Sequence, residues 1–390
     1  MDPPTHVIDP DGEIIIILQN PNAPFAELSE ALNGDHSISN PPGPSDEVPE
    51  PATENEALSN EPVELPLAGK KKKKDKKKRR TQPIPPAPEP VPEPEPVPEE
   101  PVPEESAHGW PAECVRIQVS AKHLILASSF FKKLLTGGWK ESATYLQKGS
   151  VEITADSWDT DALLILLRII HCQSSHIPRK LTLEMIAKVA VLADYYDCRE
   201  AVVFFADIWV NALDDPIPTN YYRDSILLIW VAWYFQIPDK FKQATSIAMS
   251  QSTSWIENLG LPIPNDIIRS MNYHREDAIS DLVARLYATR DELLRGTKGC
   301  GFECSSIMYG ALTKEMHLHS FLPLRPAEPF QNLSCRSLVQ KALSFQSPEW
   351  RVVRGYSSNM HSCDHSSFTD LFSMLEDTIE GYGLDQFTHS

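Results

Sequence analysis

The chain has 390 residues, of which 41% are hydrophobic, and carries a formal net charge of -18. Its length suits one large or two medium domains, and its negative charge argues against a protein that binds nucleic acid through overall charge. Seven widely spaced cysteines are too few for a secreted disulfide scaffold, so we expect reduced thiols in the cytosol or nucleus.

A strand is predicted close to the N-terminus. The turn Asp9-Pro-Asp-Gly12 precedes Glu13–Leu18, a continuous β-branched run that is typical of a buried strand. We assign residues 1–27 to the first strand of a domain that is completed further along the chain. Residues 28–111 are rich in Pro, Glu, Ser and Asn and cannot bury enough apolar surface to offset the entropy of ordering. They are therefore predicted to form a disordered insert.

The predicted insert contains two charged tracts. Residues 83–103 alternate Pro, Glu and Val, which favours a stiff, acidic polyproline II spacer over a peptide ligand. Residues 70–80 hold ten basic residues in eleven and should be solvated, because like charges at this density repel each other. The run can be interpreted as a nuclear import signal, a patch for acidic partners or a plain linker. The candidate import signal comprises Lys70, Lys71, Lys72, Lys73, Lys74, Lys76, Lys77, Lys78, Arg79 and Arg80.

Ordered structure is predicted again over residues 112–215. Val115–Val119 alternates apolar and polar residues as a half-buried strand does, and Ser150–Thr154 is a second short strand. Between them, Lys122–Leu135 carries a wide apolar stripe that predicts one helix or two short ones. Three further helices are predicted at 157–172, 183–194 and 199–213.

Residues 216–390 are predicted to be a mainly helical C-terminal region. Pro216 and Pro218 mark its boundary. Trp230 and Trp233 lie in a strongly apolar helix and, like Trp255 further along the chain, are expected in the core. The predicted helices of this region are 222–235, 240–250, 266–294, 307–319 and 368–379.

The order of these elements, with particular residues, resembles the BTB/POZ fold. Ser120–Leu135, with its Leu-Ala-Ser followed by Phe, looks like the first helical hairpin of that family. Gly138–Ser142 and Leu192–Cys198 are similar to a loop and a helix corner of the fungal BTB-like group. The resemblance implies an α+β fold: a BTB/POZ-like small sheet with helical hairpins, followed by a mainly α-helical C-terminal region. Looser similarity continues at Gly301–Ile307, Gly310–Met316 and Ser347–Trp350.

The resemblance implies a non-enzymatic protein–protein interaction module, which forms homo- or hetero-oligomers through the BTB/POZ-like domain. Leu126, Phe130 and Phe131 are expected to pack within that fold. One alternative is a nuclear regulatory or chromatin-associated factor that uses the basic run. Another, implied only by the family, is a substrate adaptor of a cullin-type ubiquitin ligase. Direct nucleic-acid binding is not expected, because acidic flanks compete for the lysines of the run.

Cysteines and histidines near residue 300 invite a zinc interpretation. Cys300-x-x-x-Cys304 and His317-x-His319 offer four sulfur and nitrogen ligands. Yet the spacing matches no standard zinc pattern, and in a helix His317 and His319 would point to different faces. A structural cysteine pair with surface histidines is favoured, so we predict no metal site. Further donors without a usable spacing are Cys335, Cys363 and His365.

Neither a catalytic motif nor a membrane segment is found in the sequence. It lacks a Gly-x-Ser-x-Gly elbow, a phosphate-binding glycine loop and a His-Glu-x-x-His pair, so we predict no enzyme, no catalytic residues and no cofactor. The longest apolar runs fall short of the roughly 18 residues of a membrane span, and the N-terminus lacks a signal-peptide pattern. The chain is thus predicted to be nuclear or cytoplasmic, neither secreted nor transmembrane.

Overall fold

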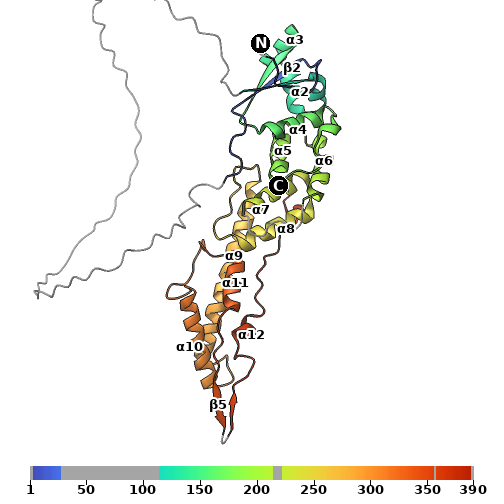
Figure 1. Cartoon of the computed structure of the whole chain (residues 1–390). Helices are drawn as coiled ribbons and strands as arrows, with labels where there is room; N and C mark the ends of the chain where they lie inside the picture. Colours follow the sequence, from blue (N-terminus) through green and yellow to red (C-terminus); the bar gives the residue numbers. More distant parts are fainter. Residues whose placement is uncertain (1–2, 28–113, 214–221, 355–356, 388–390) are drawn as a thin grey trace, which may run out of the picture. The chain divides into compact units, whose positions relative to one another are not determined.

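The computed structural model describes residues 3–27, 114–213, 222–354 and 357–387 (Figure 1). The predicted insert at 28–111, with its candidate import signal and its Pro/Glu tract, lies outside these residues. The described residues form a mixed α/β fold that is mainly helical, with twelve α-helices, a four-stranded sheet and a separate two-stranded sheet. This confirms the coarse α-and-β prediction.

The four-stranded sheet joins segments from both sides of the insert. Its order is β1-β3-β2-β4, and β2 pairs antiparallel with β3 and parallel with β4. The central strand β2 has a neighbour on each side, and its Ile14, Ile16, Ile17 and Leu18 are all buried. The predicted strands are confirmed, whereas β1 was missed because two residues show no alternation. The strands are β1 His6–Val7, β2 Ile14–Gln19, β3 Val115–Val119 and β4 Val151–Asp156.

Three short helices connect β3 to β4: α1 Ala121–Ala127, α2 Ser129–Thr136 and α3 Lys140–Lys148. The predicted apolar stripe divides at Ser128, whose extended backbone ends α1. The Ser128 hydroxyl then accepts the backbone N–H of Phe131 at 3.0 Å and caps α2. The helix α3 was not predicted, because its sequence is mostly polar.

The hairpin of α1 and α2 buries Phe131 but not Leu126. Phe131 stacks on Tyr196 with ring centroids 4.8 Å apart, and Phe130 packs edge-on against both rings. Leu126 is 88% exposed, so the expectation that it packs within the fold is wrong. Consecutive helical residues point about 100° apart, and α1 turns Leu124 toward the core instead.

The next three helices carry much of the apolar core. They are α4 Thr160–Ile170, α5 Leu183–Tyr195 and α6 Arg199–Asn211, close to their predicted ranges. Eight of the eleven residues of α4 are buried, as its continuous apolar run predicted. The carboxylate of Asp159 caps α4 by accepting the Ala162 N–H at 3.0 Å.

The C-terminal region continues from the same core, because α5 packs against α7 and α7 against α8. The long helix α9 then packs against α8, α10 and α11 (Figure 1). Among the helices of the described ranges, none has the length and apolarity to cross a membrane. The elements are α7 Tyr222–Phe235, α8 Pro238–Gln251, α9 Asn265–Arg295, α10 Phe302–Leu318, α11 Cys335–Leu343, β5 Arg351–Arg354, β6 Ser357–Met360 and α12 Phe368–Phe372.

Four of these elements differ from the sequence prediction, and Trp255, which was expected in the core, is 43% exposed. The helix α11 and the antiparallel hairpin of β5 and β6 were not predicted, since both are short. The predicted helix 368–379 ends at Phe372, and the chain beyond it runs along α8 and α9 without a regular element until a 3-10 turn at Leu384–Gln386.

Candidate functional site

A groove lies between the α1–α2 hairpin and the start of α6. It encloses about 880 Å³ and is lined by Leu126 and Ile125 together with charged side chains that include Lys122, Lys132 and Glu200. The groove mixes an exposed apolar side chain with charges of both signs, which suits contact with another protein.

The α5–α6 corner that forms part of the groove wall contains an unreactive cysteine, Cys198. Burial raises the pKa of the Cys198 thiol to about 12, and the nearby Asp197 carboxylate adds to the effect. The Ser129 hydroxyl donates a hydrogen bond to the same carboxylate, which ties α2 to the corner between α5 and α6. A protonated thiol is a poor nucleophile, so this corner supports the groove and supplies no reactive group.

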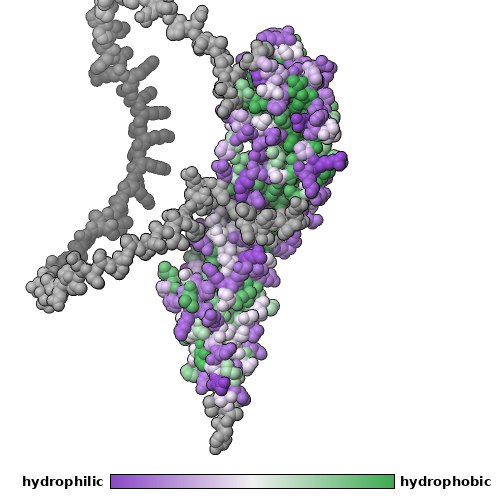
Figure 2. Space-filling view, in the orientation of Figure 1, coloured by the Kyte–Doolittle hydropathy of each residue, from purple (hydrophilic) through white to green (hydrophobic). Residues whose placement is uncertain are grey.

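Further apolar side chains are exposed on α6, namely Phe204 and Ile208. Figure 2 shows apolar surface interspersed with polar surface in the region where Figure 1 places α2 and α6. Single exposed apolar residues are ordinary in soluble proteins, whereas several on neighbouring elements favour an interaction surface.

An ion-pair network joins α4, α5 and α7 to the segment before the insert. Lys188 lies 2.9 Å from both Asp159 and Glu184, and Arg223 also pairs with Glu184 at 2.9 Å. The Arg223 guanidinium additionally donates to the backbone carbonyl of Phe25 at 2.9 Å. These contacts hold the residues before the insert against the helices, and they are structural.

The network shifts the pKa of its members. Burial raises the pKa of Asp159, but the hydrogen bonds from Ala162 and Lys188 outweigh it and hold this pKa below its usual value. The hydrogen bond from Lys188 likewise lowers the pKa of Glu184. Although burial opposes it, bonding to the two carboxylates raises the pKa of Lys188.

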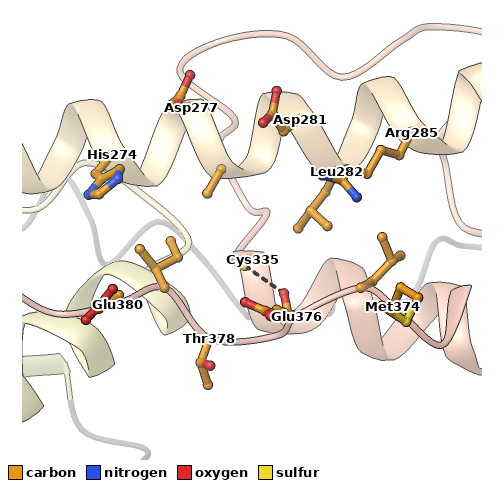
Figure 3. Close-up of a pocket in the computed structure, with 13 residues that line it drawn as sticks. His274, Asp277, Asp281, Leu282, Arg285, Cys335, Met374, Glu376, Thr378 and Glu380 are labelled. Atoms are coloured by element: carbon orange, nitrogen blue, oxygen red, sulfur yellow. Dashed lines mark hydrogen bonds between the residues drawn. The ribbon is translucent and has the colours of Figure 1, made fainter.

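A second hollow, of about 470 Å³, separates α9 from the segment that follows α12 (Figure 3). Its carboxylates come from both walls, with Asp277 and Asp281 on α9 and Glu376 and Glu380 opposite. All four are solvent-exposed, and Glu380 forms an ion pair with Lys242 at 2.7 Å.

The cysteine that lines this hollow offers no reactivity. The Cys335 thiol donates to the backbone carbonyl of Glu376 at 3.7 Å, the contact drawn as a dashed line in Figure 3. Burial raises the pKa of this thiol to about 11, so it stays protonated. The hollow is therefore a solvated acidic surface rather than a reactive site.

The most specific arrangement of side chains is a cluster of three cysteines and one histidine. The cluster consists of Cys300, Cys304, His361 and Cys363, and the four ligand atoms all lie within 4.8 Å of one another. The sulfurs of Cys304 and Cys363 are 3.7 Å apart. The Nε2 atom of His361 lies 3.5 Å from the Cys300 sulfur and 3.3 Å from the Cys363 sulfur.

Two local structures bring these four residues together. Cys304 lies in the first turn of α10, and Cys300 lies just before that helix begins. His361 and Cys363 follow β6 directly, and residues two apart in an extended segment point to the same side. The His361 ring is held in place by stacking on the Trp350 indole, with centroids 4.4 Å apart.

The cluster favours ionisation of one cysteine over another. Burial acts to raise the pKa of Cys363, but hydrogen bonds from the His365 backbone and the His361 ring lower it to about 7. Burial raises the pKa of Cys304 to about 11. Cys363 is therefore the thiol of this pair that more readily becomes a thiolate, the form that ligates metals.

Sequence reasoning found part of this cluster with the wrong partners. It considered His317 and His319 as partners of Cys300 and Cys304 and favoured a cysteine pair with surface histidines, whereas the described structure brings the two cysteines together with the His361-x-Cys363 motif. His319 instead stacks on Phe345 with centroids 5.2 Å apart, and His317 is exposed. The signal that could have identified the cluster was His361-x-Cys363 as a second ligand pair, far along the chain from the first.

Comparison with known proteins gives no assignment for the chain. No protein-family model matches it, and no curated protein matches it.

Proposed function

We propose that the chain is a non-enzymatic protein-interaction protein whose sheet and helical hairpins form a BTB/POZ-like domain. The resemblance of Ser120–Leu135 to that family's first hairpin supports the proposal. The strand pairing also supports it, because β2 is antiparallel to β3 and parallel to β4. The helices α1, α2 and α3 connect β3 to β4 along the chain. The observation that carries the function is the groove beside α1, where Leu126 is almost fully exposed.

The composition of the groove indicates what kind of partner it fits. Burial of a leucine side chain contributes roughly 1.5–3 kcal/mol, so Leu126 can supply a substantial part of the binding energy of a small interface. The charged residues around it are basic at Lys122, Lys132 and Arg199 and acidic at Asp197 and Glu200, so basic side chains are in slight excess. A partner segment with an apolar anchor and acidic neighbours would match this pattern.

The experiment compares two leucines that are both exposed on short helices. Full-length tagged chains carrying Leu126→Asp or Leu146→Asp would be purified from native cells, and their partners compared with those of the wild type. Leu146 lies on α3, is 78% exposed and does not line the groove. We expect Leu126→Asp to lose a stoichiometric partner that Leu146→Asp retains. Identical partner sets for all three chains would refute the groove as the binding surface.

A further inference from the structure

We propose that Cys300, Cys304, His361 and Cys363 bind one zinc ion that fastens the hairpin of β5 and β6 to the start of α10. The arrangement provides three sulfur ligands and one nitrogen ligand around a common point. Zinc in structural sites is bound by four such ligands in a tetrahedron.

Three of the six distances within the cluster match that tetrahedron, and all six are no longer than 4.8 Å. With Zn–S bonds of about 2.3 Å and Zn–N bonds of about 2.0 Å, ligand atoms lie roughly 3.8 Å apart for two sulfurs and roughly 3.5 Å apart for nitrogen and sulfur. The observed separations are 3.7 Å between the sulfurs of Cys304 and Cys363, and 3.5 Å and 3.3 Å from His361 Nε2 to two sulfurs. These three pairs are thus already spaced as first-row metal ligands.

A disulfide accounts for the cluster less well. A disulfide needs sulfurs about 2.05 Å apart, far closer than those of Cys304 and Cys363, and would leave Cys300 and His361 without a reason to converge. Thiolate and imidazole ligands favour zinc over magnesium or calcium, which prefer oxygen. Because the chain itself supplies four ligands, the proposed ion has no open position, and its role is structural rather than catalytic.

The surroundings of the cluster hold its ligands in place. The backbone N–H of His361 donates to the Trp350 carbonyl at 2.9 Å, and the rings of the same two residues stack. The backbone N–H of Cys363 donates to the Ser366 hydroxyl at 3.0 Å. Orienting contacts of this kind around the ligands are typical of metal sites.

The backbone before α10 also favours the cluster. Gly299 has a φ of +104°, and a Cβ there would lie 2.9 Å from the backbone nitrogen of Ser305. Only glycine allows this close approach, which folds Cys300 back over the first turn of the helix.

The hairpin gives a physical reason for a metal crosslink. An isolated two-stranded hairpin is at best marginally stable in water. Among the hairpin side chains that the structure describes, none is fully buried: Val352 is partly buried and Met360 is exposed. Zinc binding would supply free energy that apolar burial does not supply there, and each cysteine would release its thiol proton on binding.

The first test is the metal content of the full-length chain, measured by elemental analysis after purification without added metal or chelator. We expect one zinc ion per chain, lost in Cys363→Ser and in His361→Ala. The matched controls are Cys172→Ser and His317→Ala, which change exposed residues outside the cluster and should retain the ion. Full zinc content in Cys363→Ser, or a wild-type chain without metal, would overturn the proposal.

A second test uses the wild-type chain, so it does not depend on the folding of a variant. Thiol alkylation would be followed by mass spectrometry with and without a chelator. We expect Cys300 to be protected until the chelator is added, although it is exposed to solvent, while the exposed Cys172 reacts in both cases. Equal alkylation of Cys300 in both conditions, or a Cys304–Cys363 disulfide in the freshly purified chain, would contradict zinc binding.

Discussion

Two regions of the chain are held together in different ways. The first is the four-stranded sheet with its helices, and the second comprises α10 and the β5–β6 hairpin. Most residues of the strand β2 and of the helix α4 are buried. The hairpin, in contrast, brings half-buried and exposed side chains next to a group of four potential metal ligands. The difference indicates that apolar burial specifies the first region and α10, whereas the described side chains of the hairpin lack such burial and, as we propose, a metal ion fastens it.

The largest predicted effect distinguishes buried from exposed apolar residues in the first region. Leu166 in α4 is 0% exposed, whereas Leu126 in α1 is 88% exposed. We expect Leu166→Ala to lower the free energy of unfolding by about 2–5 kcal/mol, through lost burial and the cavity left behind. Leu126→Ala should change it by less than about 0.5 kcal/mol. Denaturant unfolding measures both, and equal losses would contradict the assigned core.

The next effect concerns a polar tie in the C-terminal region. Arg275 in α9 is fully buried and donates to the backbone carbonyls of Ser252, Phe330 and Leu333. Arg275→Met would leave buried carbonyls without these donors, so we expect a loss of about 3 kcal/mol in unfolding free energy.

The matched control for Arg275 lies on the same helix. Arg269 forms an exposed ion pair with Asp266 at 3.0 Å, so Arg269→Met should cost less than about 1 kcal/mol. Similar losses for the two variants would show that the buried guanidinium does not hold the loops around residues 252 and 330.

The smallest effect is pH-dependent and belongs to the Lys188 network. Lys188→Met should cost about 1 kcal/mol at neutral pH, after allowance for solvent screening. The pKa values of Asp159 and Glu184 are lowered in the folded chain, so their contribution is present above their ordinary values of 3.8 and 4.5. The difference between wild type and variant should therefore shrink as the pH falls through the lowered pKa values.

At alkaline pH the contribution of the network to stability depends on Lys188 instead of the two carboxylates. The pKa of Lys188 is raised above its ordinary value of 10.5, so its contribution is present below that pH and disappears only as the pH rises through the raised value. Unfolding measured from acid to neutral pH tests the acidic limb, with Lys242→Met as an exposed control that should show little change. A stability difference that is independent of pH would contradict the network.

Much of the fold could be predicted because its signals are local. The β-branched run before Leu18 and the apolar run in α4 indicated buried elements, and both are confirmed. The position of Leu126 was not predictable in the same way, because Leu124, Ile125 and Leu126 are all apolar and only the packed helix decides which side faces the core.

Only two of the four residues of the cysteine–histidine cluster could be paired from the sequence, for a physical reason. Cys300 and Cys304 are neighbours in the chain, but His361 and Cys363 reach them through the β5–β6 hairpin. That hairpin is too short and too polar to show a strand pattern. Nearby His317 and His319 were therefore the partners that the sequence suggested, although they do not join the cluster.

Hydrogen exchange on the full-length chain, with and without a chelator, tests most directly whether the two regions are held by different forces. We predict that the chelator speeds amide exchange in the segment after β6 and in the first turn of α10, while β2 and α4 keep their protection. Unchanged exchange around Cys304 and Cys363 in chelator would contradict the account.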